Sequence, residues 1–220
     1  FLVERGFTVF AISWRNPGPA DRDLGLDHYR RLGVEAAIDA INQIAPGRAI
    51  HATGYCLGGT LLAIAAARLQ KERPGCLRSV TLLAAQVDFT EAGELTLFIN
   101  ESQVAFLEDM MWRRGVLDAP QMAGAFQLLR SNDLIWSRLV RDYLIGQRDA
   151  PSDLMSWNAD ATRMPYWMHA DSLRKLFLDN DLAEGRYVVN GQPVALSDLR
   201  VLMLLLGTMP NQLAPRRSFP

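Results

Sequence analysis

Short apolar runs and amphipathic stretches alternate along the first part of the chain. Residues 8–14 read Thr-Val-Phe-Ala-Ile-Ser-Trp, a β-branched and aromatic run before an Asn-Pro-Gly turn, and we expect a strand there. Apolar residues then recur at helical spacing over 32–45, until Pro46-Gly47 ends the pattern. The sequence therefore predicts a strand followed by an amphipathic helix.

The alternation continues beyond this helix. Residues 49–55 and 77–85 are short and mostly apolar, as buried strands are, whereas residues 60–69 are apolar on every side, as expected of a buried helix. Residues 201–206 return to the buried-strand pattern. Strands that alternate with helices indicate a parallel sheet with helices packed on it, so the predicted class is α/β.

Residues 88–198 have a different character. They hold four of the five tryptophans and consist of helix-like stretches broken by Gly, Pro and Asn, with a hairpin expected around Asn190-Gly191. We interpret them as a large, mostly helical insertion, called the cap below. The predicted organisation is a core at 1–87, the cap at 88–198, and a return strand of the core at 199–220.

Composition and charge exclude several classes of function. Lys+Arg 23 against Asp+Glu 24 leaves a net charge of -1, which offers no basic surface for nucleic acid. Cys56 and Cys76 form neither a disulfide framework nor a zinc motif, which favours a reducing, cytoplasmic setting without a bound metal. No apolar stretch approaches the roughly 20 residues that span a bilayer. The chain begins with Phe1 rather than Met, so we expect a piece of a longer protein.

The most informative segment is residues 54–60, which read G-Y-C-L-G-G-T. The form G-x-C-x-G-G between a predicted strand and a predicted buried helix is the context of a nucleophile elbow. In such a strained turn, Gly54 and Gly58 would avoid collisions that a Cβ atom would cause, and Gly59 would let the helix approach the sheet.

Cys56 is the candidate nucleophile, because the dipole of the following helix favours a thiolate at this position. The backbone N–H of Leu57 would point to the developing oxyanion. A buried and inert thiol is the usual alternative for a free cysteine. Cys76 follows a Pro-Gly turn with no elbow around it, so we expect it to be structural.

A cysteine nucleophile on this fold needs an acid and then a histidine base, both later in the chain. None of the three histidines lies beyond the last predicted strand: His28 is expected at a helix entry, His51 at a strand start, and His169 in the cap. Asp160, in Trp157-Asn158-Ala159-Asp160, is interpreted as a helix-capping carboxylate in preference to a catalytic one.

The chain resembles the central part of polyhydroxyalkanoate synthases, cysteine-dependent enzymes of the α/β-hydrolase fold, and its elbow is most similar to the class I, single-subunit type. The resemblance runs through nearly all 220 residues. It rests on four segments in the same order: GFTVFAISWRNP at 6–17, GYCLGGT at 54–60, DFTEAGEL at 88–95 and WNADAT at 157–162.

The resemblance implies an acyltransferase that polymerises (R)-3-hydroxyacyl groups from their coenzyme A thioesters. Cys56 would carry the acyl intermediate, and coenzyme A would be part of the substrate, so no cofactor is expected. The implied partners are the growing polyester and a second copy of the chain, bound through the cap. The implied location is the cytoplasm, at the surface of polyester granules.

The chain departs from the family after the last predicted strand. The family has a Glu-Asp-His-x-x-Pro loop there, whereas residues 209–215 read M-P-N-Q-L-A-P, so Asn211 stands where the Asp should be and Gln212 where the next His should be. Asn cannot stabilise an imidazolium as a carboxylate does. The family's Gly-His segment lies beyond residue 220, and we expect the 220 residues alone to be inactive and poorly soluble.

Two other hypotheses remain open at this point. The chain could be a thiol-dependent hydrolase of an ester or thioester, with His169 recruited as the base. It could also be a non-catalytic partner that dimerises with an active synthase or coats a polymer granule.

Overall fold

A computed structural model describes residues 1–121, 124, 135–147, 152–160 and 162–207. Three parallel strands form its central sheet: β1 (His51–Tyr55), β2 (Ser79–Leu83) and β7 (Leu202–Leu206), with β2 in the middle. The register places Tyr55, Leu83 and Leu206 side by side at the carboxyl ends of the strands. The strands predicted at 49–55, 77–85 and 201–206 are confirmed, as is the α/β class.

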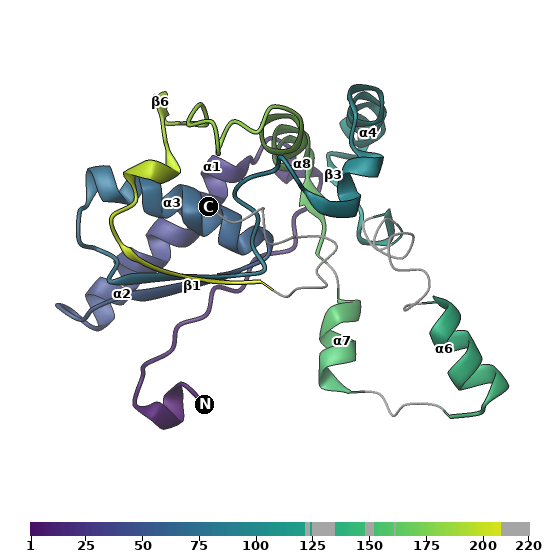
Figure 1. Cartoon of the computed structure of the whole chain (residues 1–220), viewed down its shortest axis with the longest axis horizontal. Helices are drawn as coiled ribbons and strands as arrows, with labels where there is room; N and C mark the ends of the chain where they lie inside the picture. The colour runs from purple at the N-terminus through teal and green to yellow at the C-terminus, as the bar shows by residue number, and fades with distance from the viewer. Residues whose placement is uncertain (122–123, 125–134, 148–151, 161, 208–220) are drawn as a thin grey trace.

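One face of the sheet is covered by helices. α3 (Leu57–Glu72) runs back along β1 and β2, and every residue from Gly59 to Leu69 is buried, as expected of an all-apolar helix. In Figure 1 the sheet is seen along its edge with α3 above it. The predicted helix at 32–45 is present as α1 (Leu26–Tyr29), a π-helical stretch (Arg30–Glu35) and α2 (Ala36–Ile44) in succession.

The opposite face of the sheet is exposed. Leu202, Leu204 and Leu206 point to this side and are 75%, 61% and 58% exposed, and Tyr55 at the end of β1 is 67% exposed. Side chains alternate between the two faces along each strand, so Leu82 of β2, which is fully buried, belongs to the covered face. Below the sheet, Figure 1 shows the N-terminal coil.

The strand expected at 8–14 is not formed. Residues 7–18 have no regular secondary structure, and no backbone hydrogen bond joins residues 8–14 to another described segment. Phe7 contacts the ring of His51 edge-on, with the ring centroids 6.5 Å apart, and Trp14 contacts Tyr29 at 5.3 Å. A β-branched sequence favours an extended backbone, but a strand also needs a partner ladder, and no described strand pairs with this segment.

The remaining elements follow β2 and lie mainly in the predicted cap. The hairpin expected around Asn190-Gly191 is confirmed, with positive φ at both turn residues as a two-residue hairpin turn requires. In chain order the elements are η4 (Gly93–Phe98), α4 (Glu101–Arg114), β3 (Val116–Leu117), α6 (Ser137–Leu139), η6 (Val140–Leu144), α7 (Asp153–Ala159), β4 (Met164–Pro165), α8 (Tyr166–Ser172), η7 (Leu173–Leu178), β5 (Val188–Val189), β6 (Gln192–Pro193) and η8 (Leu196–Asp198).

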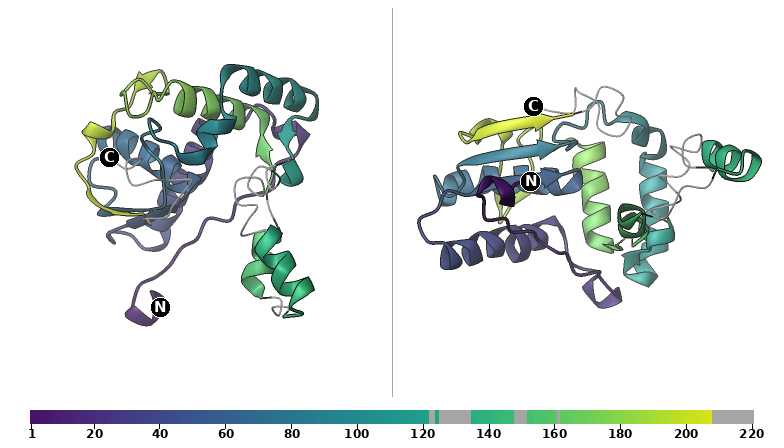
Figure 2. Two further views of the ribbon diagram at one scale, coloured as in Figure 1. Left: turned by 45° about the vertical axis from the view of Figure 1, so that its right-hand side comes forward. Right: turned by 90° about the horizontal axis from the view of Figure 1, so that it is seen from below.

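The second half of the predicted cap packs on the helical layer. Met168, Leu176, Leu182 and Val189 belong to the same hydrophobic cluster as α3 and β2. In contrast, α6 and α7 stand away from the sheet in the views of Figures 1 and 2. The boundaries at residues 88 and 198 stay a prediction. No helix in the described part of the chain is both long and apolar enough to cross a membrane.

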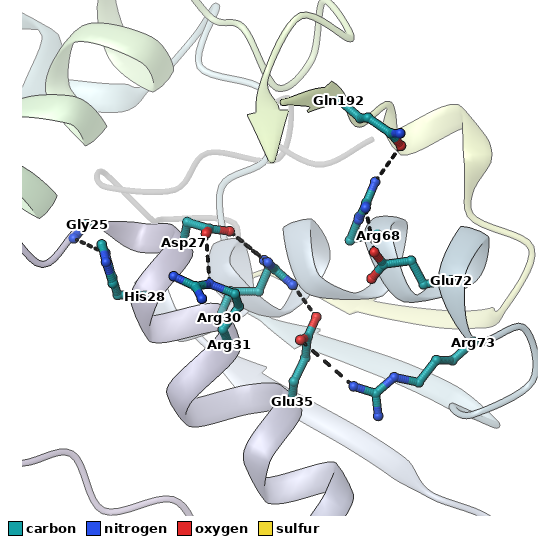
Figure 3. A network of polar contacts seen from close by, with 10 residues as sticks. All are labelled: Gly25, Asp27, His28, Arg30, Arg31, Glu35, Arg68, Glu72, Arg73 and Gln192. Atoms are coloured by element: carbon teal, nitrogen blue, oxygen red, sulfur yellow. Dashed lines mark hydrogen bonds and ion pairs between the residues drawn. The ribbon is translucent and has the colours of Figure 1, made fainter. Parts of the chain in front are cut away.

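Two buried arginines, one in the helical stretch before α2 and one in α3, have polar partners (Figure 3). Arg30 is only 1% exposed and forms ion pairs with Asp27 at 2.8 Å and with Glu35. Arg68 of α3 donates to the side-chain oxygen of Gln192 at 2.8 Å, which joins the central helix to the β5–β6 hairpin. Because a buried guanidinium without a partner is costly, these carboxylates and this amide are needed where they lie.

Candidate active site

Cys56 lies on the sharp turn between β1 and α3. Its φ of 52° and ψ of -126° put a non-glycine residue in a strained region of the backbone map. Its N–H donates to the carbonyl of Leu83 at 2.9 Å, and its own carbonyl accepts the N–H of Gly59 at 2.8 Å. The structure therefore contains the strand-turn-helix elbow that residues 54–60 predict.

The glycines around Cys56 serve different purposes. A Cβ atom on Gly54 would lie 2.6 Å from the Cα of Gly59, so Gly54 permits backbone to touch backbone. A Cβ atom on Gly59 would collide with the Cβ of Ala85, so Gly59 leaves room for that side chain. The expectation for Gly58 is wrong: a Cβ there would meet nothing within 4 Å, because this position of the first helical turn faces open space.

The elbow presents its thiol to solvent at the carboxyl edge of the parallel strands, where ligands bind in open α/β sheets. Cys56 is a free, exposed cysteine. The N–H of Leu57, the first residue of α3, donates to no described backbone carbonyl, as usual for the first turn of a helix. Together, a strained exposed thiol and a free N–H beside it can attack a carbonyl carbon and bind its oxygen.

Cys76 lies in a different environment. It is half-buried in the loop between α3 and β2, beside a small cavity that Leu69, Leu77 and Val201 also line. Burial raises the pKa of the Cys76 thiol, which disfavours its reactive thiolate. This environment agrees with the structural role expected for it.

The three histidines are placed as the sequence predicts, away from the elbow's hydrogen bonds. His28 accepts the N–H of Gly25 at 3.1 Å through Nδ1 and so binds the first turn of α1. His51 begins β1, with Nδ1 2.7 Å from the Ser79 hydroxyl, and five residues of strand put it roughly 16 Å from Cys56. In the described structure no hydrogen bond joins a histidine to the Cys56 thiol.

His169 lies in α8 of the predicted cap, and its Nδ1 is buried with no hydrogen-bond partner among the described residues. Burial lowers the pKa of His169 to about 4, so the ring is neutral near pH 7.

The two remaining candidates lie outside the elbow. Asp160 is the C-cap of α7, where its N–H donates to the carbonyls of Ser156 and Trp157, both at 3.2 Å. The expected capping role of its carboxylate is not seen, because among the described residues only the backbone of Asp160 caps the helix. Asn211 lies outside the described residues, and its role stays a prediction.

A hydrogen-bonded loop beside the elbow was missed by sequence reasoning. The Asp88 carboxylate accepts from the N–H and hydroxyl of Thr90, at 2.9 and 2.7 Å, and from the Asn180 amide at 2.9 Å. Burial alone would raise the pKa of Asp88, but these hydrogen bonds outweigh it and lower the pKa. Asp-x-Thr is a turn signal in the sequence, whereas the partner 92 residues later carries none.

Comparison with known proteins places this geometry in a family. Residues 1–178 match the profile of the alpha/beta hydrolase fold. The chain is 42% identical over 218 residues to a poly(3-hydroxyalkanoate) polymerase of Methylorubrum extorquens, covering 99% of this chain and 36% of that protein. It is 41% identical to a polymerase subunit of Rhizobium meliloti, with the same shares covered. For a subunit of Cupriavidus necator the identity is 34%, with 97% and 37% covered.

These relatives agree with the resemblance seen in the four sequence segments, and the chain spans about a third of their length. The match to the fold profile covers the elbow, α3 and β2, which are the elements that position Cys56. The chain therefore belongs to the α/β-hydrolase fold family.

Proposed function

We propose that this chain supplies the nucleophile of a poly(3-hydroxyalkanoate) polymerase, an acyltransferase that uses (R)-3-hydroxyacyl-CoA. The observation that carries the proposal is the exposed Cys56 thiol on a strained turn at the N-terminus of a buried helix. The names and identities of the relatives support this substrate class over other acyl donors.

In the proposed reaction, the Cys56 thiolate attacks the carbonyl carbon of the thioester, and the carbonyl oxygen becomes an oxyanion that accepts the N–H of Leu57. A bond forms between Sγ and the carbonyl carbon, the bond from that carbon to the sulfur of coenzyme A breaks, and coenzyme A leaves as a thiolate that takes up the proton lost by Cys56. The hydroxyl of a second hydroxyacyl unit then attacks the acyl-enzyme, which forms the ester and frees the thiol. These steps need no metal and no cofactor.

We propose that the general base comes from outside these 220 residues. His28 is engaged at a helix start, His51 lies at the far end of β1, and the Nδ1 of His169 is buried. The burial of His169 also argues against the thiol hydrolase that would recruit it. Asn211 is proposed to stand at the position of the family's aspartate, where an uncharged amide would hold a histidine poorly.

The proposed partners are the growing polyester and a second copy of this chain, at the surface of a cytoplasmic granule. Exposed aromatic side chains on and beside α6 and α7 support contacts of this kind: Trp136, Tyr143 and Trp157 are 58%, 77% and 69% exposed. Exposed apolar groups gathered on projecting helices are typical of interaction surfaces.

The proposal is tested by acylation of the chain with (R)-3-hydroxybutyryl-CoA at alkaline pH, where hydroxide from solution deprotonates the thiol and no protein base is needed. Mass spectrometry of the intact protein should show one hydroxybutyryl group on the wild type and on Cys76→Ala, and none on Cys56→Ala. An unmodified wild type, or an adduct retained in Cys56→Ala, would overturn the proposal.

The missing base has its own test in the same mixture at neutral pH. We expect no sustained release of coenzyme A, because none of the three histidines is placed to activate the next hydroxyl. Continuous turnover that Cys56→Ala abolishes would contradict an external base, and free hydroxybutyrate as the product would favour a hydrolase.

A further inference from the structure

Thr60 connects the elbow to the segment that follows β2. It lies in the first turn of α3, four residues after Cys56, and is only 2% exposed. Its hydroxyl donates to the backbone carbonyl of Gln86 at 2.6 Å. A threonine near a helix start commonly bonds within its own helix, so a hydrogen bond to a different segment indicates a specific tertiary role.

The same residue also holds the nucleophile turn through its backbone. The N–H of Thr60 donates to the carbonyl of Cys56 at 3.3 Å. Thr60 thus binds the elbow with its main chain and the chain leaving β2 with its side chain, in addition to the hydrogen bond from the Cys56 N–H to the Leu83 carbonyl.

The segment that accepts the Thr60 hydroxyl is itself firmly placed. Ala84, at the exit of β2, adopts a left-handed φ of 46°, and its N–H donates to Leu206 at 2.7 Å. Two residues after Gln86, the Asp88 carboxylate accepts from the Asn180 amide, and the side-chain Oδ1 of Asn180 accepts the N–H of Phe89 at 2.9 Å. Hydrogen bonds on both sides of Gln86 therefore hold its carbonyl in place as an acceptor for the first turn of α3.

We propose that Thr60 is a positioning residue for Cys56, whose hydroxyl holds the first turn of α3 against the chain leaving β2. The N–H groups of that turn can then face the thiol and the oxyanion in a constant orientation, which strengthens their electrostatic effect. This inference rests on the proposed role of Cys56 as the nucleophile.

The test measures alkylation of the 220-residue chain by iodoacetamide across pH, in a Cys76→Ala background so that Cys56 is the only thiol. Thr60→Val removes the hydroxyl and keeps the branched shape, whereas Thr60→Ser keeps the hydroxyl. We expect Thr60→Val to move the midpoint of the rate profile to higher pH and to slow alkylation at pH 7 about fivefold, and Thr60→Ser to restore both.

Far-UV circular dichroism verifies that each variant is folded, and Thr60→Ala replaces Thr60→Val in the comparison if the valine variant is not. Suppose that the Cys76→Ala background is alkylated with a midpoint at lower pH than a free-cysteine peptide. If Thr60→Val then leaves that midpoint unchanged, the positioning role is overturned, but Cys56 can still be the nucleophile. A failure of Thr60→Ser to restore the profile overturns the positioning role as well, because packing rather than the hydroxyl is then responsible. A background profile equal to that of the peptide also overturns the positioning role, because the turn then has no effect on the thiol for Thr60 to maintain; acylation of Cys56 by (R)-3-hydroxybutyryl-CoA tests the nucleophile separately.

Discussion

The two faces of the central sheet have opposite surroundings, although β7 is apolar on both. Val80 and Leu82 are fully buried beneath α3, whereas Leu204 on the other face is 61% exposed. The sequence of β7, Leu-Met-Leu-Leu-Leu, is apolar on both sides, as in strands that are covered on both faces. The composition of a strand therefore shows which of its faces can be buried, whereas the helices that pack on the sheet determine which faces are buried.

The largest expected effect tests how closely the covered face is packed. Gly54→Ala places a methyl group 2.6 Å from the Cα of Gly59, where only backbone movement can make room, so we expect a loss of more than about 3 kcal/mol in unfolding free energy. Gly58→Ala is the matched control, since its methyl group meets open space and alanine favours the helix. Urea unfolding followed by circular dichroism measures both, and equal losses would show that the close approach is not what matters.

The next effect concerns the apolar contacts of the covered face. Leu82→Ala removes a fully buried side chain beneath α3 and leaves a cavity, so the free energy of unfolding should fall by about 3 kcal/mol. The same urea titration provides the value. A loss below about 1 kcal/mol would mean that the layer above the strand collapses into the space.

The third prediction concerns His169 in α8, which packs against the helices of the covered face. The pKa of His169 is lowered to about 4 from 6.5 by burial, so the unfolded chain binds its proton more tightly. Stability should therefore be fully present above pH 6.5 and decline as pH falls toward 4, by roughly 2 to 3 kcal/mol. Unfolding titrations across this range should show a smaller decline for His169→Gln than for the wild type. Equal losses of stability in the two proteins would mean that the His169 ring is exposed to solvent in the folded state.

The smallest effect is expected on the exposed face. Leu204→Ser removes an apolar group that is already largely in solvent, so the unfolding free energy should change by less than about 0.5 kcal/mol. A loss comparable to that of Leu82→Ala would contradict the difference between the two faces, because it would show that Leu204 is covered in solution.

The sequence predicts the elements whose signal is local. The strands around β1, β2 and β7, the buried helix α3 and the hairpin at Asn190-Gly191 follow from periodicity and turn residues. Residues 8–14 have an equally clear strand pattern and form none, because pairing depends on a partner and not on the segment itself.

The candidate site divides in the same way. The elbow at Cys56 is predictable because strand, glycines and helix are adjacent in sequence. The hydrogen bonds of Thr60 with Gln86 and of Asp88 with Asn180 join residues 26 and 92 positions apart, and no pattern in one sequence pairs them. Gly58 is a further case that the sequence does not predict. The motif indicates that glycines are required, but it does not show at which of them a Cβ atom would collide with a neighbour.

The order of strands in the sheet also bears on how the chain acquires its structure. β1 and β2 are joined by α3 alone, whereas β7 pairs with β2 only after the chain has passed through residues 84–201. A loop about five times longer adds only about 1.4 kcal/mol to the entropy of closure, but distant pairings form slowly. We therefore expect the elbow to be assembled early, with β1, α3 and β2 as a folding unit, and the edge of β2 to stay open until β7 docks. During synthesis, the candidate nucleophile would be in place before β7 leaves the ribosome.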